Sequence, residues 1–290
     1  MKRVLITGTS GFLGSNLTGD LKNRGIEVLS LSRKEVAENV TTHVQGSFEN
    51  FEDLDKLKLD GSETLIHLAA VTGEASEEDA IRVNVYETSR LVRYCVDKGL
   101  KRLILASSIA AVGCLTREFV PRQVPIPDYH PCDSSNAYGL SKYLMEEYLR
   151  YVKRNHSELD ITLFRIGVVL KRTAVTPGIE QISNMWRPFC TLGCIHINDV
   201  VNAFRFAVEK DIKPSFGIYN LVAEDSFSSI PTIEALRLSL GDRFAKLDLS
   251  AYKDPQDSYK GLYDISGLKH SFGYTPKVRV SQLKENGTGA

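Results

Sequence analysis

The fold is decided by the stretch Val4-Leu5-Ile6-Thr7-Gly8-Thr9-Ser10-Gly11-Phe12-Leu13-Gly14 near the start of the chain. An aliphatic run typical of a buried strand comes first, and a helical pattern follows it. Its glycines stand three apart, where a dinucleotide-binding turn needs them. One lets the chain turn sharply, the next lets backbone approach a pyrophosphate, and the third lets helix pack on strand. The stretch therefore predicts a nucleotide-binding turn, with an ordinary strand-to-helix turn as the alternative.

The composition is that of an ordinary globular enzyme. Of 290 residues, 42% are hydrophobic and 25% are charged. Lys+Arg and Asp+Glu both number 36, so we expect no electrostatic field that would recruit nucleic acid or a membrane surface. No apolar run resembles a signal peptide or reaches the length of a membrane span. We therefore expect a cytoplasmic protein.

The five cysteines are scattered along the chain, at Cys95, Cys114, Cys132, Cys190 and Cys194. An odd and scattered set indicates reduced thiols in the cytosol. Cys190 and Cys194 are close enough in sequence to suggest a metal site, but no matching Cys/His pair accompanies them. We expect no metal, and we interpret both as core or wall residues.

Strands and helices alternate through the first 170 residues. Strands are expected at 26–31, 42–46, 64–68, 102–106 and 161–166, and helices at 12–24, 51–59, 77–98 and 138–155. Apolar strands that alternate with helices predict a parallel sheet covered on both faces. Ligands bind such sheets at the carboxyl ends of the strands. The fold class is thus α/β, a Rossmann-type doubly wound parallel sheet.

The pattern loosens beyond about residue 170. We expect a dinucleotide-binding domain over 1–170, to which 198–215 returns, and a smaller C-terminal α/β substrate lobe over 171–290. An irregular proline-containing stretch over 113–137 interrupts the first domain. Loops of this length inside a compact domain are usually functional.

Tyr138 and Lys142 stand four residues apart in an expected helix, hence on one face of it. A cationic lysine one turn away favours the phenolate and brings the tyrosine pKa towards the working range. Ser108, at the end of an expected strand, could hydrogen-bond the same substrate oxygen. Together they would move a proton at a hydroxyl or carbonyl while a nicotinamide exchanges hydride at the carbon.

At this point the chain resembles the extended short-chain dehydrogenase/reductases, in particular their nucleotide-sugar epimerases, dehydratases and reductases. Nearly the whole chain takes part in the resemblance. Besides the opening stretch and the Tyr-x-x-x-Lys pair, the matching segments are His67-Leu68-Ala69-Ala70, Val83 to Thr88, Ser107 to Gly113, Leu163-Phe164-Arg165, Ile195 to Val200, Ile218-Tyr219-Asn220 and Phe272 to Pro276.

The resemblance implies a catalytic triad of Ser108, Tyr138 and Lys142. It also implies a cofactor site that runs from the glycine turn along the ends of the strands. The expected cofactor-binding residues are Gly8, Ser10, Gly11, Phe12, Leu13, Gly14, Ser32, Arg33, Ser47, Phe48, Leu68, Ala69, Ala70, Asn84, Tyr138 and Lys142. Ser47 and Phe48 stand where the family often carries an acidic residue near the adenine. Asp199 is expected to be a helix cap rather than a catalyst.

The end of the second strand bears on the choice of cofactor. An acidic residue there binds the ribose 2′-hydroxyl of NAD, whereas an arginine accommodates the 2′-phosphate of NADP. This chain has Ser32-Arg33-Lys34, and Arg33 can clamp a phosphate bidentately. We expect NADP in preference to NAD; the alternative is that both cations are simply solvated.

Departures from the family narrow the expected reaction. Ser108-Ile109-Ala110 lacks the acidic residues of the 4,6-dehydratases, and Leu192-Gly193-Cys194 stands where many members carry an arginine for the substrate diphosphate. Arg172 or Arg187 could replace that contact. The leading hypothesis is a 4-ketoreductase or epimerase of a nucleotide sugar. The alternatives are a reductase of a non-sugar carbonyl (flavonoid- or steroid-like) and a non-catalytic cofactor-sensing regulator.

The family often forms homodimers through a four-helix bundle. The corresponding helices here lie near 81–96 and 138–152, and both have apolar residues to spare. We therefore expect a small-molecule substrate, no nucleic-acid or membrane partner, and a possible homodimer.

Overall fold

A seven-stranded sheet forms the centre of the fold. The computed structural model describes residues 2–36, 40–72, 75–252, 254 and 257–284. The strand order is β3-β2-β1-β4-β5-β6-β9, which confirms the expected Rossmann-type parallel sheet. The strands are β1 (Arg3–Thr7), β2 (Glu27–Ser32), β3 (Thr42–Gln45), β4 (Thr64–His67), β5 (Arg102–Ser108), β6 (Asp160–Ile166) and β9 (Ser215–Leu221). A separate parallel pair joins β7 (Val168–Leu170) to β8 (Cys194–His196).

The helices alternate with these strands. The longer ones are α1 (Phe12–Asn23), α4 (Thr88–Asp97), α5 (Ala137–Asn155), α8 (Ile197–Glu209) and α9 (Thr232–Leu240). The shorter α-helices are α2 (Phe51–Asp55), α3 (Glu77–Ile81), α6 (Ile179–Ser183) and α7 (Pro188–Thr191). Single turns of other helix types are η1 (Arg82–Glu87), η2 (Ile109–Val112), η3 (Gly241–Lys246), η4 (Ser250–Tyr252), η6 (Gly267–Phe272) and η7 (Val280–Gln282). No described helix has both the length and the apolar character needed to cross a membrane.

Contacts divide the chain into two compact units. The first holds Met1–Ser107, Leu140–Phe164 and Val201–Ile218, and the second holds Ser108–Gly139, Arg165–Val200 and Tyr219–Ala290. Residues 108–139 thus fall in the second unit, whereas the sequence placed them in the first domain. The chain passes between the units several times, so each unit is assembled from distant segments.

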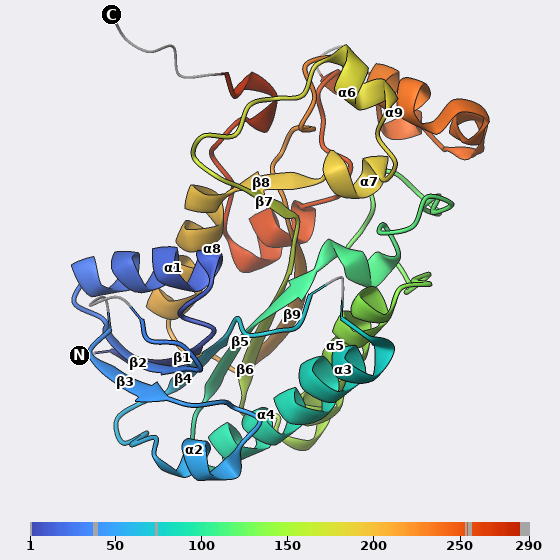
Figure 1. Cartoon of the computed structure of the whole chain (residues 1–290). Coiled ribbons are helices and arrows are strands. Elements are labelled where there is room, and N and C mark those ends of the chain that lie inside the picture. Colours follow the sequence, from blue (N-terminus) through green and yellow to red (C-terminus); the bar gives the residue numbers. More distant parts are fainter. Residues whose placement is uncertain (1, 37–39, 73–74, 253, 255–256, 285–290) are drawn as a thin grey trace, which may run out of the picture. The chain divides into compact units, whose positions relative to one another are not determined.

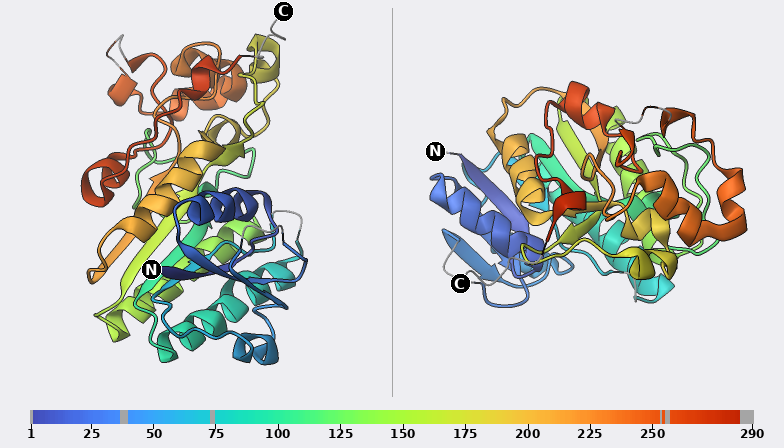
Figure 2. Two further views of the ribbon diagram at one scale, coloured as in Figure 1. Left: turned by 90° about the vertical axis from the view of Figure 1, so that its left-hand side faces the viewer. Right: turned by 90° about the horizontal axis from the view of Figure 1, so that it is seen from above.

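The core of the first unit lies between its sheet and the helices α2, α4 and α5 (Figure 1). Strand residues of one parity point into it, since side chains alternate between the faces of a sheet. Helices α1 and α8 cover the opposite face, as Figures 1 and 2 show. The strands are therefore apolar on both faces, which is why they read as continuous hydrophobic runs. The buried strand residues of this core include Leu5, Leu29, Leu31, Leu65, Leu103, Leu105, Ile161 and Leu163.

A buried ion pair joins the first residues of β5 and β6 in the first unit. Arg102 is 2% exposed, and its Nε donates to Asp160 Oδ2 at 2.7 Å. The same guanidinium donates to the carbonyl oxygens of Val208, Lys210 and Asp211. Val208 lies in the last turn of α8 and the other two residues follow it, where backbone acceptors lack helical partners. One arginine thereby joins three segments that are far apart in the sequence.

The helix expected over 77–98 contains a π-helical turn, η1, between α3 and α4. Directly after it, the side-chain hydroxyl of Thr88, the first residue of α4, donates to the carbonyl oxygen of Val83. Such wide turns inside α-helices are frequent at functional sites. The turn carries Asn84, one of the expected cofactor-lining residues.

Two buried aspartates of the second unit bind the C-terminal stretch of the chain. Asp199 accepts hydrogen bonds from the backbone N–H groups of Lys277 and Val278 and from the Tyr274 hydroxyl. Asp225 accepts from the backbone and hydroxyl of Ser281. Asp199 therefore fixes a distant segment, which is a structural role other than the helix cap that the sequence suggested.

We expect Asp199→Ala to lower the free energy of unfolding by about 2–4 kcal/mol, because it leaves buried donors without an acceptor. The measurement is urea denaturation followed by circular dichroism. Asn198→Ala, an exposed neighbour, is the matched control and should change stability by less than about 0.5 kcal/mol. Equal effects of the two substitutions would contradict the assigned role.

Candidate functional site

In the glycine turn after β1, the backbone of Gly8 packs directly against helix α1 at Gly14. Gly8 has φ +78°, a left-handed conformation that favours glycine. A Cβ atom on Gly14 would lie 2.2 Å from the carbonyl oxygen of Gly8, and one on Gly8 would lie 2.7 Å from the backbone nitrogen of Ala69. Gly11 is exposed, and its N–H donates to Gly8 O. The first and third glycines thus permit close packing, while the second faces solvent.

The N-terminus of α1 is suited to an anion. Its N-cap is Gly11, which supplies no side-chain hydrogen bond, and its first turn carries no acidic residue. Ser10 and Phe12 beside it are exposed, and Leu13 is half-buried. Unsatisfied N–H groups and the positive end of the helix dipole favour a phosphate at such a position.

Hydrogen bonds connect the glycine turn to the end of β2. The Ser32 hydroxyl donates to Ser10 Oγ at 2.9 Å, and Thr9 Oγ1 lies 2.6 Å from Ser30 Oγ. Arg33 follows Ser32 directly, and its side chain is exposed. Arg33 therefore lies at the same sheet edge as the turn.

Ser47 and Phe48 follow the end of β3. The Ser47 N–H donates to Asp53 Oδ2 at 2.9 Å. Phe48 is 7% exposed, and its ring packs edge-on against His67 with centroids 5.0 Å apart. Phe48 is therefore mainly a core residue, whereas Ser47 stays half-buried.

The segment Leu68 to Ala70 follows β4, and all three residues are half-buried beside Gly8. Asn84 lies behind it and is 2% exposed. Its side-chain amide exchanges two hydrogen bonds with the backbone of Val71 and donates to Ser141 Oγ on α5. Asn84 thus fixes this segment relative to the helix that carries Lys142.

Ser108 and Tyr138 lie together in the second unit. The Ser108 hydroxyl accepts a hydrogen bond from Ala110 N–H at the start of η2 and also hydrogen-bonds the Tyr138 phenol. A Cβ atom on Gly139, next to Tyr138, would lie 2.4 Å from the carbonyl oxygen of Ala110. The absence of a side chain there lets α5 begin against η2. Sequence reasoning missed Gly139, although a glycine in the first turn of a long helix is a usable signal.

Burial raises the pKa of Tyr138, and the hydrogen bond with Ser108 opposes that rise. The net direction is the reverse of the one expected from the neighbouring lysine alone. The physical reason is that desolvation disfavours the charged phenolate. The phenol is accordingly the resting form at neutral pH.

Lys142 lies one turn along α5 from Tyr138, in the part of the helix that belongs to the first unit. It is 3% exposed, and its Nζ donates to the carbonyl oxygen of Ala106 at 2.8 Å. Burial lowers the Lys142 pKa to about 8, against an opposing effect of Glu146. Its ammonium group therefore loses its proton near physiological pH rather than far above it.

Two buried polar contacts near this helix were missed from the sequence. The Ser107 hydroxyl donates to Glu146 Oε1 at 2.6 Å, and Glu146 is 1% exposed. His67 lies between the hydroxyl groups of Thr7 and Thr88, and burial lowers its pKa to about 3. Both contacts join residues that are far apart in the sequence, so no local spacing indicates them.

The two arginines considered for a substrate diphosphate differ in their surroundings. Arg172 donates from Nε to Asn198 Oδ1 at 3.2 Å. Arg187 stacks over the Trp186 ring at 4.2 Å, and its buried Nε finds no hydrogen-bond partner within the described part of the chain. Arg187 therefore differs from Arg172 in having a guanidinium nitrogen that is not used within the described residues.

Comparison with known proteins places these features in context. Residues 4–175 match the model of the NAD dependent epimerase/dehydratase family. A decarboxylating sterol-4-alpha-carboxylate 3-dehydrogenase of Dictyostelium discoideum is 25% identical over 268 residues, which is 87% of this chain and 79% of that protein. UDP-glucose 4-epimerase 2 of Arabidopsis thaliana is 25% identical over 295 residues, 83% and 82% of the two chains. Among solved structures, UDP-glucose 4-epimerase from Bifidobacterium longum in complex with NAD+ and UDP shares the fold with a TM-score of 0.69. It is 18% identical and covers 97% of this chain and 96% of its own.

The close packing of the glycine turn leads us to predict that a side chain at Gly14 lowers the stability of the protein. We expect Gly14→Ala to destabilise the protein by more than about 2 kcal/mol, because the new methyl group meets backbone that cannot move aside cheaply. Gly11→Ala is the matched control, since its Cβ would meet only Gly8 O, at 3.3 Å. Thermal denaturation of both variants checks this, and a Gly14→Ala protein as stable as the control would refute it.

Proposed function

Because the chain belongs to the NAD dependent epimerase/dehydratase family, we propose that it is an oxidoreductase that acts on a nucleotide-activated sugar. The reaction we propose is reduction at the 4-keto carbon or epimerisation at the same carbon. The observation that carries the proposal is the hydrogen bond between Ser108 and Tyr138, with Lys142 one turn further along α5. The fold alone would not select these residues, since one fold serves many functions.

The first unit offers a fitting cradle for the dinucleotide. The exposed N-terminus of α1 would hold the pyrophosphate, because its free N–H groups favour an anion. The absence of side chains at Gly8 and Gly14 permits the close packing that shapes the turn. Leu68 to Ala70 would line the path of the dinucleotide beside the turn. When bound, the nicotinamide supplies hydride exchange with a substrate carbon.

The side chains of Ser108, Tyr138 and Lys142 would manage the proton. In a reduction, the Tyr138 phenol donates its proton to the substrate oxygen while Ser108 donates a hydrogen bond to that oxygen. A protonated Lys142 stabilises the phenolate that remains. In the reverse direction the phenolate accepts the proton. Because burial raises the Tyr138 pKa, the phenol is ready as an acid in the reducing direction.

Two observations support a nucleotide sugar as the substrate. UDP-glucose 4-epimerases recur among the relatives, and one of them in Mus musculus is 27% identical with 99% of this chain covered. In the second unit, the Nε of Arg187, which has no hydrogen-bond partner among the described residues, offers a donor for a diphosphate oxygen. Arginine suits such an oxygen because its donors are planar and permanently charged.

The test is turnover with a panel of 4-keto-6-deoxy sugar nucleotides and UDP-hexoses, with NADPH or NADH added. We expect turnover of at least one substrate and a loss of about 10²–10⁴-fold in kcat for Tyr138→Phe, since the phenol oxygen is the proton carrier. Tyr143→Phe, on the same helix, is the matched control. No turnover and no substrate-dependent binding across the panel would overturn the proposal.

A second candidate is a dehydrogenase or reductase of a sterol-like carbonyl compound. The observation that favours it is the 87% coverage of this chain by the sterol-4-carboxylate dehydrogenase relative. The segment Leu192-Gly193-Cys194, which stands where many family members carry the diphosphate arginine, agrees with it. Sterol turnover without any affinity for UDP would select this candidate. A non-catalytic cofactor sensor, the third possibility, would keep its cellular role in the Tyr138→Phe variant.

We also propose that NADP is preferred over NAD, on the strength of the exposed Arg33 beside Ser32. Arg33→Ala should weaken NADPH by about 10–100-fold, as expected for the loss of a charged hydrogen bond, and NADH hardly at all. Fluorescence titration with both cofactors measures this. Lys34→Ala, the exposed neighbour, is the control, and equal losses for both cofactors would show that Arg33 does not read the 2′-phosphate.

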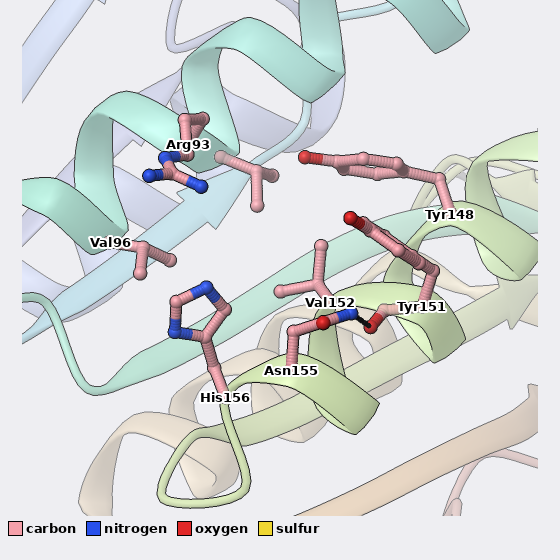
Figure 3. A pocket seen from close by; sticks show the side chains of 8 residues that line it. Arg93, Val96, Tyr148, Tyr151, Val152, Asn155 and His156 are labelled. Atoms are coloured by element: carbon pink, nitrogen blue, oxygen red, sulfur yellow. Dashed lines mark hydrogen bonds between the residues drawn. The ribbon is translucent and has the colours of Figure 1, made fainter.

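Finally, we propose a homodimer formed through α4 and α5, in keeping with the cytoplasmic, cofactor-dependent enzyme expected from the sequence. These helices flank a hollow of about 270 Å³ in the first unit (Figure 3). Val96 and Val152 line it together with Tyr148 and Tyr151, and Tyr151 is 54% exposed. Arg93, Asn155 and His156 add polar groups to the same hollow. A surface shared by two neighbouring helices can be buried by the same surface of a second copy.

A further inference from the structure

A buried carboxylate lies behind the proposed catalytic lysine. Glu146 is one helical turn beyond Lys142 on α5, and the two side chains are 1% and 3% exposed. Both lie in the first unit. Glutamate and lysine are seldom fully buried unless paired or hydrogen-bonded. The burial of both side chains on neighbouring turns of one helix therefore needs a physical explanation.

Hydrogen bonds attach both side chains to the end of β5. Lys142 Nζ donates to the carbonyl oxygen of Ala106 at 2.8 Å. The hydroxyl of the next residue, Ser107, donates to Glu146 Oε1 at 2.6 Å. Two successive residues of one strand thus hold two successive turns of one helix. Ser108, which follows them directly, is the residue that hydrogen-bonds Tyr138.

We propose that Glu146 is a positioning residue, whose buried charge keeps Lys142 in its ammonium form and whose bond to Ser107 fixes the end of β5 against α5. This inference rests on the proposed function, because it concerns the lysine that supports Tyr138. Glu146 acts through Lys142 and Ser107 and need not touch substrate or cofactor.

The charges around Lys142 favour this role. Burial lowers the Lys142 pKa, and Glu146 is the group that opposes this effect. His67, at the end of β4, also faces the lysine, but its own pKa of about 3 leaves it neutral. Tyr138, on the same helix, is an uncharged phenol at neutral pH because burial raises its pKa. Glu146 is thus the negative charge that favours the ammonium form.

The consequence is a dependence on pH with a defined sign. Lys142 titrates near pH 8, so activity that needs its ammonium form falls as the pH rises through that value. Removal of the Glu146 charge leaves the desolvation effect without this opposing charge, which moves the titration to lower pH. A neighbouring charge about one helical turn away alters a pKa by about one unit.

The experiment compares Glu146→Gln, Glu146→Asp and Glu147→Gln. Glu147 is the next residue, is 44% exposed and pairs with Arg150 on the surface, so it provides a matched control. For each variant we would record the pH profile of kcat, the thermal stability, and the titration of the Lys142 side chain by NMR of ¹⁵N-labelled lysine, assigned with Lys142→Arg.

We expect the alkaline limb of the kcat profile and the Lys142 titration to move down together by about one pH unit in Glu146→Gln. At pH 8 this amounts to a several-fold loss of activity. Glu146→Asp keeps the charge and should restore most of the profile, and Glu147→Gln should leave it unchanged.

Two outcomes would overturn the inference. One is a lower stability of Glu146→Gln with an unchanged Lys142 titration, which would make Glu146 merely structural. The other is a kcat profile whose alkaline limb does not move although the Lys142 titration shifts. That result would show that the Glu146 charge does not affect catalysis. The NMR titration needs no substrate, so a failure of the proposed function would show itself separately, as absence of turnover in the wild-type protein.

Discussion

The contact between the carbonyl oxygen of Gly8 and the backbone of helix α1 at Gly14 is the constraint on which the first unit depends. No side chain fits between them. Because the helix starts directly on the turn, its free N–H groups stay at the carboxyl edge of the sheet. The same turn lies against Ala69, which brings the exits of β1 and β4 together. A cradle for phosphate follows from this packing rather than from any one polar side chain.

Polar side chains buried near the carboxyl ends of the strands also stabilise this region through hydrogen bonds. His67 binds two threonine hydroxyls, Asn84 binds Val71 and Ser141, and Glu146 binds Ser107. Each satisfies groups that would otherwise be costly to bury. The contacts of Asn84 and Glu146 tie the π-helical turn and β5 to helix α5, and those of His67 tie β4 to β1 and α4. The helix that carries Tyr138 and Lys142 is thus held by hydrogen bonds as well as by apolar packing.

The strands, the glycine turn and the family could be predicted because their signals are local. Alternating apolar runs and three spaced glycines occupy short windows of sequence. The contacts of Asp199 with Lys277 and of Arg102 with Val208 could not be predicted, since their partners are far away in the chain. The direction of the Tyr138 pKa was mistaken for a related reason. Burial is a property of the whole fold, and the lysine spacing says nothing about it.

The discontinuous first unit has a consequence for how the protein is made on the ribosome. Its last segment, Val201–Ile218, supplies the carbonyl groups that Arg102 binds and part of β9, which completes the sheet beside β6. During synthesis, β6 therefore emerges well before its neighbour and presents an unpaired edge. Long-range pairing of this kind is slow, and nascent chains with open strand edges tend to aggregate. The first unit is thus expected to complete its sheet only after Val201–Ile218 has been translated.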